Sequence, residues 1–187
     1  MAQISTAISD LVLSVSSFYG AGVIARRYIH AAVGLLVIAL AAGVGMIRFL
    51  NIAPLHRRNA VISLHTKLSW FATILGIPLI AASFSIKYRS DYGSQLHIIS
   101  GIAGIMLSIL LPKFKDACTH FASTLAILSI LLQSFRADNV LAMAGAILYA
   151  VASTVIGTVG YLIGYLRIDI FHYFLVVANI AFVRALQ

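Results

Sequence analysis

Long runs of apolar residues, separated by short polar segments, dominate the chain. A helix that crosses a bilayer needs about 20 predominantly apolar residues, and most of the runs have this length. The polar segments are too short to form a separate soluble domain. The pattern predicts an all-α, polytopic membrane helical bundle that forms a single domain over residues 1–187. It predicts seven transmembrane helices, or six if the first does not span: Ile8–Ala25, Ile29–Leu50, Val61–Ile86, Gln95–Leu111, Ala117–Phe135, Val140–Leu166 and Ile168–Leu186.

Three of these spans carry features that affect their helices. The first is the weakest candidate, because several serines and Asp10 lie within it. The third contains Pro78, which removes a backbone N–H and is expected to kink the helix. The sixth contains Gly157, Gly160 and Gly164, which we expect to let another helix approach closely. The sequence does not specify the oligomeric state, and a homo- or hetero-oligomer is compatible with it.

The composition agrees with a chain that lies almost entirely in the bilayer. Of 187 residues, 61% are hydrophobic and only 10% are charged, whereas a soluble domain carries about 25% charged residues. The net charge is +8, but the basic residues cluster at predicted helix ends. We therefore expect them to contact lipid phosphates and not nucleic acid. These basic residues divide almost evenly between the two faces, so the positive-inside rule assigns no orientation.

The single cysteine, Cys118, excludes a disulfide framework and a Cys-ligated metal site.

The histidines are the sharpest chemical signal. His56 lies in a loop, and the other five lie in predicted spans: His30, His65, His97, His120 and His172. Ionisable residues within spans are rare, usually face the bundle interior and tend to be functional. All five also lie within a turn or two of a helix N-terminus. The alternative is therefore that they are interfacial side chains in contact with water or headgroups.

Four of these histidines are followed, four residues later, by a small residue. Positions i and i+4 share one helix face, so the small residue leaves room for a flat group beside the imidazole. A haem held by histidines in a helical bundle needs such space. The two histidines of each predicted pair open their helices on the same face of the membrane, so each pair can bind one b-type haem. The four are His30 with Gly34, His65 with Ser69, His97 with Gly101 and His120 with Thr124, and the predicted pairs are His30–His97 and His65–His120.

This arrangement resembles the cytochrome b561 family, whose members hold two bis-histidine b haems in a four-helix core. The likeness covers roughly residues 29–111 and includes the segments Ser-Leu-His65 and Leu-His97-Ile-Ile-Ser-Gly101-Ile-Ala-Gly104. It implies a transmembrane oxidoreductase with haem b as its cofactor. It also implies an acidic reductant such as ascorbate, for which the candidate contacts are Lys67, Lys87 and Arg89.

The chain also departs from that family. The spacing from His30 to His65 and from His65 to His97 suits it, but the spacing from His97 to His120 is too short. A seventh helix is unusual as well. On an alternative alignment only the His30–His97 pair carries over, which leaves a single haem.

Other side chains have less specific interpretations. The acidic residues all lie near predicted helix ends or in turns, so we expect neither a zinc hydrolase nor a transporter with charges at mid-membrane. Asp169 is expected to form a surface pair with Arg167. Four aromatic residues either line an electron path or pack in the membrane and at its interface: Trp70, Tyr149, Tyr161 and Tyr165.

Two functions follow from these observations. The first is a b-type haem protein that passes electrons between carriers on the two faces of the membrane. The second is a non-catalytic structural, assembly or interaction protein whose histidines contact the interface. A channel or a lipid-binding bundle is a third alternative.

Overall fold

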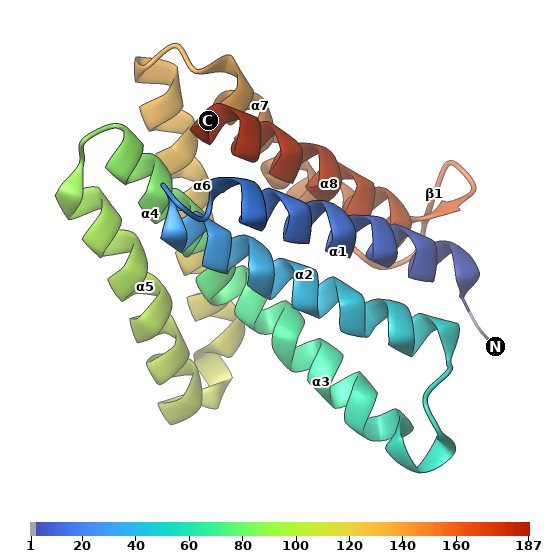
Figure 1. Cartoon of the computed structure of the whole chain (residues 1–187). Helices are drawn as coiled ribbons and strands as arrows, with labels where there is room; N and C mark the ends of the chain where they lie inside the picture. Colours follow the sequence, from blue (N-terminus) through green and yellow to red (C-terminus); the bar gives the residue numbers. More distant parts are fainter. Residues whose placement is uncertain (1–2) are drawn as a thin grey trace.

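The computed structural model describes residues 3–187, which are mostly helical (Figure 1). A π-helical turn, Ala72–Gly76, joins α3 (Arg58–Phe71) to α4 (Ile77–Lys87). A second π-helical turn, Ala152–Ile156, extends α7 (Val140–Val151). A small antiparallel hairpin of β1 (Tyr161–Leu162) and β2 (Tyr165–Leu166) precedes the last helix. The predicted all-α bundle is confirmed. Its helices are α1 (Ile4–Ile24), α2 (Ile29–Leu50), α3 (Arg58–Phe71), α4 (Ile77–Lys87), α5 (Asp91–Leu110), α6 (Lys115–Arg136), α7 (Val140–Val151) and α8 (Arg167–Leu186).

Six helical segments of the described chain are long and apolar enough to cross a bilayer. Twenty residues of α-helix rise about 30 Å, which matches the hydrocarbon thickness of a bilayer. The first span, expected to be the weakest, is among them as α1. The protein is therefore an integral, multi-pass membrane protein. The other long segments are α2, Leu55–Lys87, α5, Pro112–Arg136 and α8.

The prediction of one long sixth span, Val140–Leu166, is wrong in its second half. The apolar helix ends at Ile156, and the three glycines belong to the loop and hairpin that follow. Their φ angles, +64° at Gly157, +91° at Gly160 and +80° at Gly164, are left-handed conformations that favour glycine. No neighbouring atom comes within 4 Å of a Cβ placed on any of them. They are turn residues and not helix-packing residues.

The distortion expected at Pro78 takes the form of a π-helical turn. Proline has no N–H, so the carbonyl of Ile74 loses its usual partner four residues later. The turn Ala72–Gly76 directly before it widens accordingly. This turn places the carbonyl of Ile74 against α5, where a Cβ on Gly101 would lie 3.1 Å from its oxygen.

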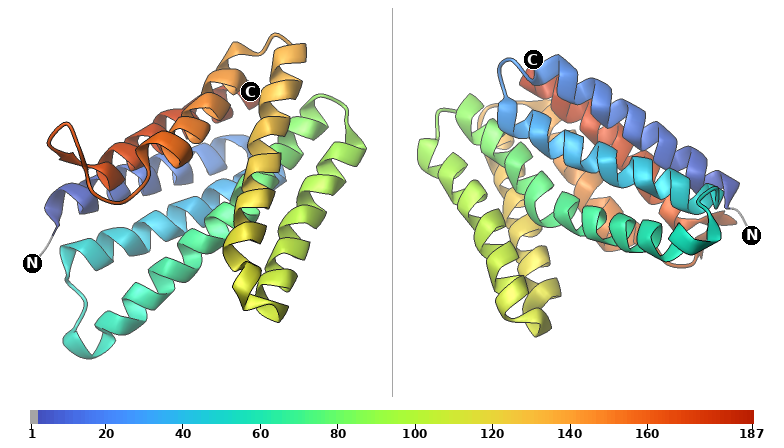
Figure 2. Two further views of the ribbon diagram at one scale, coloured as in Figure 1. Left: turned by 180° about the vertical axis from the view of Figure 1, so that it is seen from behind. Right: turned by 60° about the horizontal axis from the view of Figure 1, so that its bottom comes forward.

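Most of the helices form a closed ring. Around it, α1 packs on α2, α2 on α3 and α4, α4 on α6, α6 on α7, α7 on α8 and α8 on α1. Helix α5 lies outside the ring against α4 and α6, inclined to α1, α2 and α8 (Figures 1 and 2). We call the face of the bundle that carries Arg26 and Arg27 face A, and the face that carries Arg57 and Arg58 face B.

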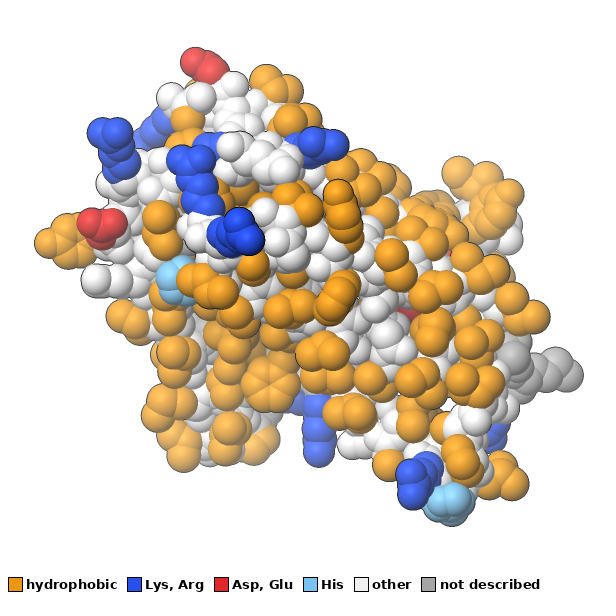
Figure 3. All heavy atoms as spheres, in the orientation of Figure 1, with side chains coloured by type: hydrophobic (Ala, Val, Ile, Leu, Met, Phe, Trp, Pro, Cys, Tyr) orange, Lys and Arg blue, Asp and Glu red, His pale blue; other side chains and the backbone are white. Residues whose placement is uncertain are grey.

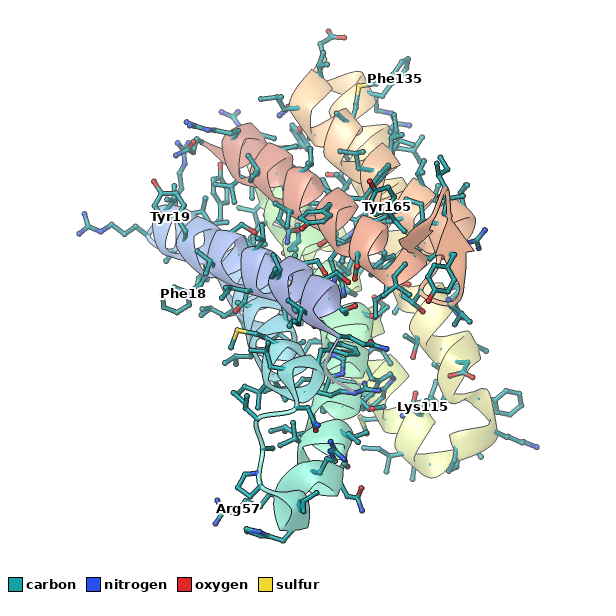
Figure 4. All side chains as sticks on the ribbon, turned by 90° about the vertical axis from the view of Figure 1, so that its right-hand side faces the viewer. Phe18, Tyr19, Arg57, Lys115, Phe135 and Tyr165 are labelled. Carbon is teal, nitrogen blue, oxygen red and sulfur yellow. The ribbon has the colours of Figure 1, made fainter. Side chains whose placement is uncertain are left out.

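The outer surface of the bundle is suited to lipid. Hydrophobic side chains cover the face shown in Figure 3, and basic side chains gather at its two ends. Phe18, Tyr19 and Phe135 are exposed and point away from the bundle (Figure 4). Several polar side chains, in contrast, are buried between the helices, both inside the ring and where α5 packs against it.

Candidate functional site

A cavity of about 370 Å³ lies inside the ring. Every helix of the ring lines it, and α5 does not. Its walls are largely apolar, with Leu13, Ile38, Ile77, Ile127 and Leu175 among them. One end is polar, because Asp10, His65 and His172 meet there.

The cavity opens sideways between α6 and α7. These helices are joined by a short turn at face A and separate toward face B (Figure 2). Thr124 and Leu128 of α6 line the cavity and are exposed, and so are Ser153 and Thr154 in the π-helical end of α7. In a bilayer these residues face lipid, so a molecule can enter from the hydrocarbon layer.

Asp10 of α1 is the centre of the polar end and is 1% exposed. Its Oδ1 lies 3.5 Å from Nδ1 of His172 on α8. Its Oδ2 has no hydrogen-bond partner and lies against Gly45 of α2. A Cβ on Gly45 would meet this oxygen and would also lie 2.8 Å from Nε2 of His65 on α3. The absence of a side chain at Gly45 therefore lets three helices bring their ionisable groups together.

Ser9 and Asp169 extend this cluster along α1 and α8. Ser9 Oγ lies 3.0 Å from Nδ1 of His172, donates to the carbonyl of Thr6 at 3.0 Å, and lies 3.5 Å from Oδ1 of Asp169. The predicted surface pair of Asp169 with Arg167 is wrong, because Asp169 is only 8% exposed. It shares a helix face with His172, three residues later, and that face packs against α1.

The hydrogen-bond partners give the two histidines different tautomers. Arg48 NH1 lies 2.8 Å from Nδ1 of His65. A guanidinium only donates, so this nitrogen accepts and a neutral His65 carries its proton on Nε2. In His172, Nδ1 faces Ser9 Oγ and the Asp10 carboxylate. It therefore carries the proton, and Nε2 keeps a lone pair.

Both histidines line the cavity. Within residues 3–187 neither Nε2 makes a hydrogen bond. Nε2 of His172, on a ring held by a carboxylate, has the arrangement of a general base. Nε2–H of His65 is a donor that lies against Gly45, on the same side as the unpartnered Oδ2 of Asp10. Among the described residues, no three His, Cys, Asp or Glu side chains are arranged to hold a metal ion.

Asp10, His65 and His172 also share one depth, which the sequence analysis did not recognise. Each lies roughly two turns from the start of a helix that begins at face B. The sequence placed Asp10 near a helix end but did not connect it with the histidines. This shared depth could be derived from the sequence. The first, third and seventh predicted spans run in the same direction across the membrane, and the three residues lie at similar distances from the starts of these spans.

The structure does not bring His30 and His97 together. His97 is 1% exposed and its Nε2 lies 2.8 Å from Ser129 Oγ on α6. His30 is half-buried at the start of α2, where the next residue, Ala31, donates its N–H to Ser83 on α4. Helix α4 packs against both α2 and α5 and lies between them. Helix α4 therefore separates the two helices that carry these imidazoles.

The space predicted beside these histidines for a flat group, at Gly34 and Gly101, is filled by α4 and the turn before it. A Cβ on Gly34 would lie 2.5 Å from the carbonyl oxygen of Gly76, and one on Gly101 would lie 3.1 Å from that of Ile74. Both glycines therefore allow close helix contact. They leave no room for a flat group.

The remaining predicted site residues are spread over the molecule. His120 is exposed on α6, whereas His65 is bonded to Arg48. Lys67 is exposed on α3, in the half of the bundle near face B. Lys87 and Arg89 lie at face A, where Arg89 is exposed and Lys87 donates to the carbonyl of Ala185 at the end of α8. The three basic residues therefore do not form one site.

The four aromatic residues also have separate environments. Tyr149 lines the cavity and donates to Oδ1 of Asn179 at 2.6 Å. Trp70 donates to Thr119 at 2.9 Å, which links α3 to α6. Tyr161 and Tyr165 are exposed in the hairpin.

Comparison with protein-family models, curated proteins and solved structures finds no match to this chain. The fold and the site define its class on their own: a multi-pass, all-α membrane protein with a polar-ended cavity inside a ring of helices.

Proposed function

We propose that this protein binds an amphipathic molecule taken from the lipid phase. The apolar part of the molecule lies along the cavity walls, and its polar group lies at Asp10, His65 and His172. The observation that carries this proposal is the cavity itself. Its volume, about 370 Å³, is within the usual range of roughly 300–1,000 Å³ for small-molecule sites. Its mouth, between α6 and α7, faces lipid.

The polar end supports binding over a purely structural role. A charged side chain in the membrane costs about 2.5–3.5 kcal/mol or more, and such residues usually mark functional sites. Asp10 is buried with one oxygen unpartnered, so this carboxylate is not fully satisfied by the protein. Apolar walls with a few convergent polar groups are the usual composition of a ligand site.

Closing the mouth tests this proposal. Ser153→Trp places a large ring at the mouth, whereas Val155→Trp places the same ring on an exposed position of the same π-helical turn that does not line the cavity. Native mass spectrometry of protein released from membranes should detect one bound amphiphile on the wild type and on Val155→Trp. We expect Ser153→Trp to retain less than about a tenth of it, a loss of about 1.4 kcal/mol.

Two outcomes would contradict this account. One is a wild-type protein that carries no small molecule from a membrane extract that has not been delipidated. The other is equal occupancy in the two tryptophan variants.

A b-type haem electron carrier is the second candidate, and one observation favours it. His97 is buried and its Nδ1 has no hydrogen-bond partner, which leaves an imidazole nitrogen free to bind iron. Haem b would supply one-electron redox chemistry, with a donor such as ascorbate. For His30 to join His97 in holding the group, α4 would have to move.

The visible spectrum tests the haem candidate. Dithionite should produce a sharp reduced α-band in the purified protein, and His97→Ala should abolish or halve it. Because His120 is exposed on α6, His120→Ala tests whether a second site contributes. A colourless preparation from cells with adequate haem would reject this candidate.

A further inference from the structure

We infer that the polar end of the cavity selects an uncharged hydroxyl group, so that the ligand is a long-chain alcohol and not an anionic lipid. This inference rests on the proposed function, because it requires a ligand in the cavity. It adds the chemical class of that ligand, which follows from the hydrogen-bonding capacity of the site.

The two histidines offer one acceptor and one donor to the cavity. The contact of Ser9 and Asp10 with Nδ1 of His172 leaves the lone pair on its Nε2. The contact of Arg48 with Nδ1 of His65 leaves a proton on its Nε2. A hydroxyl is itself one donor and one acceptor. It can donate to the lone pair of His172 and accept from an N–H such as that of His65, whereas a carboxylate can only accept.

The charges around the site disfavour an anion. Asp10 contacts the ring of His172 on the side opposite the free nitrogen, and Asp169 is a second buried carboxylate, near Ser9. The nearest cation, Arg48, is bonded to His65 and lies over the ring of Phe49 at 5.0 Å. A carboxylate or phosphate headgroup would therefore have two carboxylates nearby, and repulsion is strong where water is excluded.

The walls of the cavity fit a hydrocarbon chain. Beyond the polar end the lining is mainly Leu, Ile and Ala. Its hydroxyl groups are those of Ser69, Thr73, Ser123, Thr124, Tyr149, Ser153 and Thr154. Tyr149 already donates to Asn179, and Ser153 and Thr154 donate to carbonyls of α7. Ser123 already donates to the carbonyl of Thr119 and Thr73 to that of Ser69. These walls therefore provide no second strong polar site for a bulky headgroup.

The experiment uses a photoactivatable hexadecanol that carries a mid-chain diazirine and a terminal alkyne, with the full-length protein in nanodiscs. Unlabelled hexadecanol and hexadecanoate compete for labelling at mildly alkaline pH, where the acid is ionised. We expect hexadecanol to compete about a hundredfold better, with about tenfold from the hydrogen bond that the ionised acid cannot donate and about tenfold from repulsion by the carboxylates. His172→Phe should reduce this preference to about tenfold, because the carboxylates remain. His56→Phe, at an exposed position in the turn before α3 and outside the cavity, should leave the preference unchanged.

A second variant keeps the test decisive if His172→Phe does not fold. Asp10→Asn preserves shape but removes the charge, and it should improve competition by hexadecanoate by about tenfold. Hexadecanoate that competes as well as hexadecanol against the wild type would overturn the inference while leaving the cavity as a lipid site. Labelling that neither compound reduces would instead reject the proposed function.

Discussion

Replacing Gly34 by leucine is expected to separate α2 from α4 and to lower the free energy of unfolding by about 3 kcal/mol, the upper part of the range for overpacking. A Cβ at this position would lie 2.5 Å from the carbonyl oxygen of Gly76 and 3.1 Å from Ile80. The first of these atoms is backbone and cannot rotate away, so the helices must move apart. The loss should appear as a lower midpoint of thermal unfolding in detergent, followed by size-exclusion chromatography.

Gly22→Leu is the matched control for that experiment. Gly22 also lies in a ring helix, α1, but apart from adjacent residues and the backbone of its own helix, no atom of the described chain lies within 4 Å of a Cβ placed there. Its midpoint should stay close to that of the wild type. Equal midpoints for the two variants would show that α2 and α4 do not touch at Gly34.

Replacing Asp10 by alanine is expected to have the largest effect on ligand binding, about a hundredfold. A hundredfold loss of binding is about 2.7 kcal/mol, which is within the range of roughly 1.5–3 kcal/mol for a hydrogen bond to a charged group. Without the carboxylate, Nδ1 of His172 keeps only Ser9 as a partner, so the ring can rotate and its tautomer is no longer fixed. The measurement is saturable labelling by the hexadecanol probe as a function of its concentration.

Asp10→Ala should weaken ligand binding without lowering the stability of the protein. The substitution removes a buried carboxylate with an unpartnered oxygen, so the thermal midpoint should stay the same or rise. Asp91→Ala, at an exposed position in the first turn of α5 outside the ring, is the control and should change neither quantity. A lower midpoint with intact labelling would mean that Asp10 supports the fold and not the site.

The spans were predictable because the requirement for about 20 apolar residues depends on composition alone. The hairpin after α7 was not, because its glycines suit a membrane helix in composition. Whether Gly157, Gly160 and Gly164 pack against a helix or adopt positive φ depends on the neighbours they meet. The sequence does not specify those neighbours.

The site was harder to predict for a similar reason. The pairing of His30 with His97 assumed that α2 and α5 are neighbours, but α4 lies between them and α5 lies outside the ring. Which helices are adjacent is a property of packing, which apolar periodicity does not encode. The depth of Asp10, His65 and His172 could be derived from helix starts alone. Their convergence also needed α1, α3 and α8 to surround the same space.

Peptide mapping of the photolabelled wild-type protein tests most directly whether this cavity is a ligand site. The cavity predicts that adducts of the hexadecanol probe cluster on its lining segments, residues 69–77, 123–128 and 149–154. Helix α5, which is exposed along much of its length but contributes nothing to the lining, should remain almost unlabelled. Adducts spread evenly over α5 and the other lipid-facing helices, unaffected by an excess of hexadecanol, would contradict a binding site inside the ring.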